Sequence, residues 1–191
     1  MIRTAQHPFE LLAQLLDYPH AGYQETVKSA CEELDNQVPE LGSGLRGFAE
    51  FVEATDLCEL EEQFTRTFDI NPVCNLELGW LLYGEQYERG AFLVRMREML
   101  RSYEVEETAE LPDHLCHVLP LLSRLPEEQA KQLAVNEVLP AMSKMRKGFA
   151  EIKNPYRQVI EVIGDTLLDA YGMPSASDES DLDPSSKEDS E

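Results

Sequence analysis

The spacing of the apolar residues constrains the fold of this chain more than any other feature. Apolar side chains recur every three or four positions along most of the sequence, which is the spacing of one face of an α-helix. No run of β-branched and aromatic residues alternates with polar residues between hairpin turns, as a strand in a sheet would require. The pattern predicts an all-α, single-domain bundle of about eight to ten helices.

Proline and capping residues divide the N-terminal part of this pattern into four predicted helices. Pro19 and Pro39 are expected to end the first and second, because a residue before proline disfavours the helical conformation. Asp56 followed by Glu59 resembles a capping box and should begin the fourth. The third is expected to be short, with Gly-Ser-Gly at residues 42–44 in a turn between helices. The apolar faces of the four helices contain, in order, Phe9, Leu12, Leu15 and Leu16; Tyr23, Val27, Ala30, Cys31 and Leu34; Leu45, Phe48 and Val52; and Leu57, Leu60, Phe64 and Phe68.

The middle of the chain is less regular. Residues 70–90 are apolar but interrupted by one proline and three glycines, which predicts a loop with a short helix. A long helix with Phe92, Met96 and Leu100 on one face should follow, and then an acidic connector at residues 104–110. The next helix is expected to begin near Pro112, since proline is favoured in a first helical turn.

The last two predicted helices have clear starts. Pro126, followed by two glutamates, should begin one of them, and Pro140 in its interior should kink or break it. Asn154 can cap the final helix with Pro155 at its first position, and Gly172 should end it. The sequence therefore predicts a helical domain at residues 1–173 and, from its composition of Ser, Asp and Glu, a disordered acidic tail at 174–191.

Charge and cysteine content exclude several classes of function. Thirty-seven acidic and sixteen basic residues give a formal charge of −21, which repels nucleic acid. Four separated cysteines without a C-x-x-C pair fit reduced thiols in the cytoplasm. A secretory signal and an apolar run long enough to span a membrane are both absent, so we expect a cytoplasmic protein without direct membrane insertion.

The usual catalytic motifs are also missing. The sequence contains no Walker-type phosphate loop, no G-x-G-x-x-G dinucleotide motif and no G-x-S-x-G nucleophile elbow. These absences argue against a nucleotide-dependent enzyme and against a serine hydrolase with this elbow.

One polar cluster leaves two interpretations open. Glu110, His114 and His117 would share a face if all three lay on a helix, and could then hold a metal ion. Alternatively, Glu110 and Asp113 cap and charge a helix start, with His114 as a surface partner. The apolar stretch at residues 76–83, which contains Trp80, is either ordinary core or a recognition surface.

Five separated motifs resemble a known family. They are L-L-x-x-L-L-D-Y-P at 11–19, F-T-R-T-F-D at 64–69, Y-G-E-Q-Y-E-R-G at 83–90, E-L-P-D-H-L at 110–115 and R-L-P at 124–126. In this order, across about residues 9–170, they resemble the NarJ/TorD/DmsD group of molybdoenzyme maturation chaperones, and most closely its nitrate reductase branch.

The resemblance implies a helical, non-enzymatic chaperone without a permanent cofactor. Such a protein binds the N-terminal or twin-arginine-type segment of a molybdopterin-containing catalytic subunit, as a signal-peptide-binding chaperone, in a groove between helices. The family's Asp-His pair falls on Asp113 and His114. The complete set of peptide-binding candidates is Trp80, Tyr83, Gly84, Arg89, Glu110, Pro112, Asp113 and His114.

Several alternatives stay open at this stage. The nitrate reductase branch tends to have a phenylalanine-glutamate-histidine run where this chain has Gly79, Trp80 and Leu81, so the client enzyme is not identified. A metal-dependent enzyme using Glu110, His114 and His117 is one rival, and an acidic adaptor acting through residues 175–191 is another. Monomer and homodimer are equally compatible with the sequence.

Overall fold

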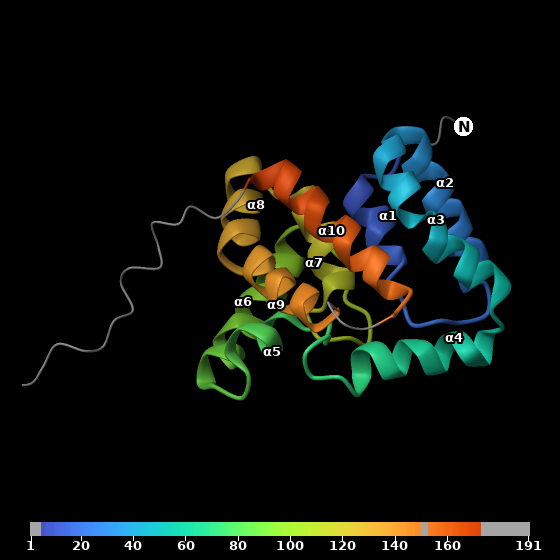
Figure 1. The fold of residues 1–191 in the computed structure, drawn as a ribbon. Helices are drawn as coiled ribbons and strands as arrows, with labels where there is room; N and C mark the ends of the chain where they lie inside the picture. The colour runs from blue at the N-terminus through green and yellow to red at the C-terminus, as the bar shows by residue number, and fades with distance from the viewer. Residues whose placement is uncertain (1–4, 150–152, 173–191) are drawn as a thin grey trace, which may run out of the picture.

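The computed structural model describes residues 5–149 and 153–172, and all regular elements in these residues are helical (Figure 1). The all-α prediction is confirmed. The predicted acidic tail lies outside the described residues. Among the described helices, none has the length and apolar composition needed to cross a lipid bilayer. The elements in chain order are α1 (Pro8–Gln14), α2 (Tyr23–Gln37), α3 (Pro39–Ala54), α4 (Leu57–Phe64), π-helical η1 (Thr65–Asp69), α5 (Leu78–Tyr83), α6 (Tyr87–Ser102), α7 (Leu115–Arg124), α8 (Glu127–Leu133), π-helical η2 (Ala134–Val138), α9 (Leu139–Phe149) and α10 (Tyr156–Tyr171).

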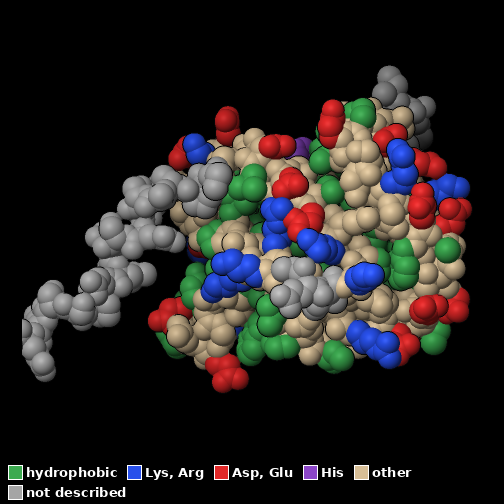
Figure 2. All heavy atoms as spheres, in the orientation of Figure 1, with side chains coloured by type: hydrophobic (Ala, Val, Ile, Leu, Met, Phe, Trp, Pro, Cys, Tyr) green, Lys and Arg blue, Asp and Glu red, His purple; other side chains and the backbone are tan. Residues whose placement is uncertain are grey.

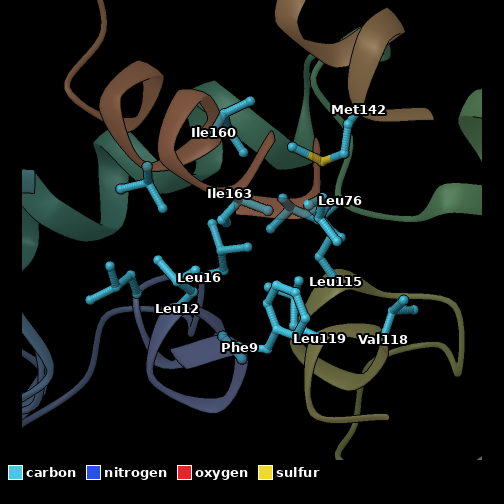
Figure 3. Packing of buried hydrophobic residues seen from close by; sticks show 14 of the residues in the cluster. Phe9, Leu12, Leu16, Leu76, Leu115, Val118, Leu119, Met142, Ile160 and Ile163 are labelled. Carbon is cyan, nitrogen blue, oxygen red and sulfur yellow. The ribbon is translucent and has the colours of Figure 1, made fainter. Parts of the chain in front are cut away.

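One part of the hydrophobic core lies where α1, α7, α9 and α10 meet (Figure 3). Phe9 and Leu12 of α1, which the sequence places on the apolar face of the first helix, are buried here, and full burial of one such side chain is worth about 1.5–3 kcal/mol. Leu76, which precedes α5, is also buried in this core, so its packing holds the segment that leads into α5. The residues labelled in Figure 3 are Phe9, Leu12, Leu16, Leu76, Leu115, Val118, Leu119, Met142, Ile160 and Ile163.

A cluster of aromatic rings extends the core toward α3, α4 and η1. The ring of Tyr156, at the start of α10, lies 5.1 Å from Phe48, 5.8 Å from Phe64 and 5.0 Å from Phe68 between ring centroids. These distances are typical of favourable edge-to-face and tilted aromatic pairs. Leu60, Phe64 and Phe68 of the predicted apolar face are buried, as expected, whereas Leu57 of the same predicted face is 36% exposed. The contacts of Tyr156 show that α10 connects the two parts of the core.

The predicted helix boundaries are correct where a local side chain forms the cap. Asp56 accepts the N–H of Glu59 at 3.0 Å and starts α4. Asn154 accepts the N–H of Tyr156 at 2.9 Å. The helix α10 begins at Tyr156, one position later than predicted. Gly172, with φ of +80°, ends α10.

The predicted turn at residues 42–44 is wrong, because these residues lie inside the 16-residue helix α3. A Cβ atom at Gly42 would lie 2.3 Å from Oδ1 and 2.5 Å from Cα of Asp35 in α2. A Cβ atom at Gly44 would lie 2.8 Å from the Val162 side chain in α10. The glycines therefore permit close helix packing, which the sequence pattern cannot distinguish from a turn.

Two predictions about prolines need correction. The helix expected near Pro112 begins at Leu115, because residues 113–115 pair in extended form with residues 76–78. The helix does not break at Pro140, which lies in α9; the α-helical pattern is interrupted just before it, by η2, and the chain remains helical through both elements. A π-helical turn before the proline absorbs its missing N–H without breaking the helix.

The packing of α2 against α3 gives a first test. Gly42→Ala should lower the free energy of unfolding by about 1–3 kcal/mol, because overpacking against Asp35 outweighs the helix propensity of alanine. Chemical denaturation measures this. Gly90→Ala in α6 is the matched control, since a Cβ there meets nothing within 4 Å, and it should raise stability by up to about 1 kcal/mol. Equal effects of the two substitutions would contradict the packing argument.

Candidate functional site

The short helix α5 is held at its start by Asp113, a residue distant in sequence. The side chain of Asp113 is completely buried, with 0% exposure, and its Oδ2 atom accepts the N–H of Gly79 at 2.7 Å. The N–H of Leu78 donates to the Asp113 carbonyl at 3.2 Å, and the N–H of Leu115 donates to the Leu76 carbonyl at 3.0 Å. One carboxylate therefore caps α5 and fixes it to the start of α7.

Gly79 makes this cap possible because it has no side chain. A Cβ atom at this position would lie 2.8 Å from Asp113 Oδ2 and 3.0 Å from Phe92 Cδ1 in α6. Such distances leave no room for a methyl group between the helix and the carboxylate. The glycine that interrupts the apolar stretch is thus a contact point between α5, α6 and Asp113.

The groups around Asp113 only partly stabilise its ionised form. Burial raises the pKa of its carboxyl, and the hydrogen bond from Gly79 and the nearby charge of Arg89 only partly oppose this rise. Oδ1 of Asp113 and Nε of Arg89 are both buried without a hydrogen-bond partner among the described residues. Burial, and then the charge of Asp113, also raise the pKa of Glu77. Two carboxyl groups and one guanidinium therefore lie close together at the start of α5.

Trp80 and Arg89 lie on the outer side of this arrangement. The Arg89 guanidinium pairs with Glu77 at 2.6 Å and lies 5.3 Å from the centroid of the Trp80 ring. The indole N–H of Trp80 donates to the carbonyl of Pro72 at 3.1 Å. An ion pair and a cation–π contact thus surround a partly exposed tryptophan, the only one in the chain.

The far end of α5 contains the remaining predicted residues of this segment. The ring of Tyr83 lies 5.6 Å from that of Phe92. Gly84, at φ +58°, ends the helix and donates its N–H to the Trp80 carbonyl. In α9, Lys144 donates to the Leu81 carbonyl at 2.8 Å, a favourable position for a cation near a helix C-terminus. No spacing in the sequence could have indicated Lys144 as a neighbour of α5.

The eight predicted residues separate into an outer and an inner group. Trp80, Tyr83, Gly84 and Arg89 are partly exposed, and we call them the α5 surface. Pro112, Asp113 and His114 are buried, and of these Asp113 caps α5 and His114 caps α7. Glu110 is exposed, and its charge acts on Glu77.

Both histidines of the alternative metal site already form hydrogen bonds within the protein. Nδ1 of His114 accepts the N–H of Cys116 at 3.2 Å and caps α7. Nε2 of His117 accepts the N–H of Thr108 at 3.0 Å, while its Nδ1 lies 2.9 Å from the Leu111 carbonyl. Neither nitrogen of His117 is therefore free to bind a metal.

The two local interpretations of this cluster are consequently wrong. Glu110 lies before the helix, so it cannot share a helical face with His114 and His117, and residues 5–149 and 153–172 contain no group of three or more potential ligands. The interpretation of Glu110 and Asp113 as caps of this helix also fails, because His114 caps α7 and Asp113 caps α5.

A surface pocket of about 370 Å³ lies elsewhere, between α2 and α3. Acidic side chains outnumber basic ones around it, and no residue of the α5 surface lines it. The predicted groove beside Asp113 does not coincide with this pocket. Its lining residues are Gln24, Glu25, Lys28, Cys31, Glu32, Arg46, Ala49, Glu50 and Glu53.

Comparison with known proteins relates this geometry to a family. Residues 24–160 match a family model described as nitrate reductase delta subunit. The chain is 24% identical over 160 residues to the nitrate reductase molybdenum cofactor assembly chaperone NarJ of Escherichia coli strain K12, covering 80% of this chain and 66% of that protein. NarJ of Escherichia coli O157:H7 matches with the same identity and coverage. The chain thus spans just under two thirds of the length of these curated relatives, and the matched residues include the α5 surface and Asp113.

The Asp113 cap can be tested through the single tryptophan. Asp113→Ala leaves the buried N–H of Gly79 without an acceptor, so α5 should loosen and the emission of Trp80 should shift to longer wavelength. Asp113→Asn, which keeps an acceptor oxygen, should give a much smaller shift. Identical emission spectra of the wild type and Asp113→Ala would show that the cap does not hold α5.

The buried His114 predicts a pH dependence of stability. Burial, reinforced by the charge of His117, lowers its pKa from 6.5 to about 4, so between these pH values the unfolded chain binds more protons than the folded chain. Stability should therefore fall from pH 6.5 to 4, by up to about 3 kcal/mol from this residue. Denaturant unfolding at matched pH should show that the free energy of unfolding falls less steeply in His114→Asn, which lacks the imidazole. Asparagine is chosen because it can still cap α7.

Comparison at matched pH is needed because Asp113 has the opposite effect, its raised pKa favouring the folded state as pH falls. His20→Asn, at an exposed position, controls for the loss of a histidine. If the free energy of unfolding depended on pH in the same way in the wild type and in His114→Asn, His114 would not be the source of this dependence.

Proposed function

The chain belongs to the nitrate reductase delta subunit family, and on this premise we propose that it is an assembly chaperone rather than an enzyme. Its proposed client is the catalytic subunit of a nitrate reductase-like, molybdopterin-containing oxidoreductase. The name of the two similar Escherichia coli proteins, molybdenum cofactor assembly chaperone, supports this class of function. The proposed location is the cytoplasm, where the four free cysteines would stay reduced.

The proposed binding site is the α5 surface, and the bound segment is the N-terminal or twin-arginine-type segment of the client. The observation that carries this proposal is the partly exposed Trp80, presented on a helix that Asp113 anchors from inside. Aromatic side chains in such positions contribute a large share of binding energy in protein interfaces. Because Asp113 is buried, its proposed role is to position α5 rather than to touch the client.

The groups beside Trp80 suit a basic client residue. The Glu77 carboxylate and the Trp80 ring both contact the guanidinium of Arg89, so together they form a site for such a group. The Arg89 and Glu77 side chains are 23% and 24% exposed, which leaves the pair accessible from the surface. A client arginine would compete with Arg89 for these partners, and the acidic surface of the protein would increase its rate of association.

The expected affinity is moderate. Each apolar client side chain that becomes fully buried contributes about 1.5–3 kcal/mol before ordering costs are subtracted. A micromolar dissociation constant corresponds to about 8 kcal/mol, so several such side chains together with the charge contacts would be needed to reach it. Reversible binding of this strength suits a chaperone that must later release its client.

Titration with a tryptophan-free peptide of the client's N-terminal segment tests the proposal. Binding should change the emission of Trp80, which reports only on the α5 surface because the chain has no other tryptophan. Calorimetry should show that Trp80→Ala weakens binding roughly 10- to 100-fold. Raising the salt concentration should also weaken it, since part of the attraction is between exposed charges.

Tyr87→Ala is the control, because this aromatic side chain in α6 is 89% exposed and lies outside the α5 surface. It should leave the affinity unchanged. Heat release with unchanged Trp80 emission would place the site elsewhere on the molecule. An absence of heat, together with failure of the intact client to co-purify, would reject the chaperone proposal itself.

A further inference from the structure

Basic residues gather on one face of this acidic protein. Residues 144–157 contain five of the sixteen lysines and arginines of the chain and one acidic residue, Glu151, which lies outside the described residues. Figure 2 shows Lys and Arg side chains near the middle of this face, over α9 and the first turns of α10. We call Lys144, Lys147 and Lys153 the basic strip.

The basic strip is available for a further partner. The neighbouring Arg146 is already paired with Glu161 and Asp165 of α10, so it is not counted in the strip. Lys147 and Lys153 are exposed and form no ion pair with any described residue. Lys144 donates only to a neutral backbone carbonyl, that of Leu81. The strip therefore carries positive charge that the described residues do not neutralise.

Apolar groups border this charge. Lys144 contacts the partly exposed Leu81 of α5 through its carbonyl. Gly148, next to Lys147, lies so close to Val73 that a Cβ there would meet Val73 Cγ1 at 2.7 Å. Val73 is nevertheless 49% exposed, and Ile70 nearby in the chain is 70% exposed. Positive and apolar groups thus form one mixed surface between residues 70–74, α5 and α9.

The C-terminal segment of the same chain has the complementary chemistry. Residues 174–191 contain seven acidic residues and one lysine. Leu182 is their only large apolar residue, and Asp181 and Asp183 flank it. An apolar side chain between two carboxylates matches an apolar surface bordered by lysines.

The segment is also long enough to reach this surface. Arg146 contacts Asp165 at 3.1 Å, and Asp165 lies six residues, or about 9 Å, before the end of α10 at Tyr171. The ten residues that follow Gly172, ending at Leu182, can span up to about 35 Å. The end of α10 therefore delivers the segment close to α9.

We propose that residues 174–191 dock on the basic strip of their own chain, with Leu182 against Val73 and Leu81 and with Asp181 and Asp183 facing Lys144 and Lys147. This intramolecular contact goes beyond the proposed function. If the α5 surface also binds a client, the docked segment lies beside that surface and competes with the client for access to it.

Site-specific photo-crosslinking in the full-length chain tests the proposal. With p-benzoylphenylalanine in place of Leu182, irradiation at low salt should give adducts in residues 70–83 and 144–149, identified by mass spectrometry. The double variant Lys147→Glu with Lys153→Glu should reduce the yield of these adducts roughly tenfold, as should molar salt, since exposed ion pairs are screened. Lys28→Glu with Lys131→Glu, at exposed positions in α2 and α8, makes the same change of charge and should leave the yield unchanged.

Three results would overturn the proposal. The first is adducts spread over the molecule, and the second is a yield that neither charge reversal nor salt alters. The third is a crosslinked species of twice the mass whose share grows with protein concentration, because the segment would then dock on a second copy. No client is present in this experiment, so its outcome is independent of the proposed function.

Discussion

The buried carboxylate of Asp113 is the interaction on which the architecture of the candidate site depends. A six-residue helix such as α5 is too short to be stable by itself, and the N–H groups of its first turn need an acceptor. Asp113 supplies that acceptor from a segment 34 residues later in the chain. The extended pairing of residues 76–78 with 113–115 adds backbone hydrogen bonds, and Gly79 lets the carboxylate approach.

This arrangement reverses the usual distribution of polar and apolar side chains. The ionisable Asp113 and His114 are inside, at 0% and 7% exposure, whereas the aromatic Trp80 is at the surface. Burying ionisable groups costs stability, and the raised pKa of Asp113 and the lowered pKa of His114 both reflect that cost. This cost has a functional explanation if Asp113 and His114 fix the position of the α5 surface and a partner binds there.

The sequence predicts those features that local interactions determine. Helical spacing identifies the all-α fold, and Asp56 and Gly172 mark helix ends because their effect acts within a few residues. Contacts between distant segments are not encoded in spacing. Gly42 is a packing contact with Asp35 and not a turn, and Glu110 and His114 do not share a helix because residues 113–115 pair with residues 76–78. The association of Trp80 and Arg89 with Asp113 came from family resemblance, while the roles of Glu77 and Lys144 required the structure.

In the proposed arrangement, the α5 surface binds the client while Asp113 holds α5 from inside the protein. Hydrogen–deuterium exchange of the full-length chain, with and without a saturating peptide of the client's N-terminal segment, tests both parts in one measurement. We expect slower exchange of amides in residues 77–84 and 113–117 when the peptide is bound, and unchanged exchange in α2 and α3. Protection confined to the pocket between α2 and α3, with the amides of α5 unaffected, would show that the client binds elsewhere.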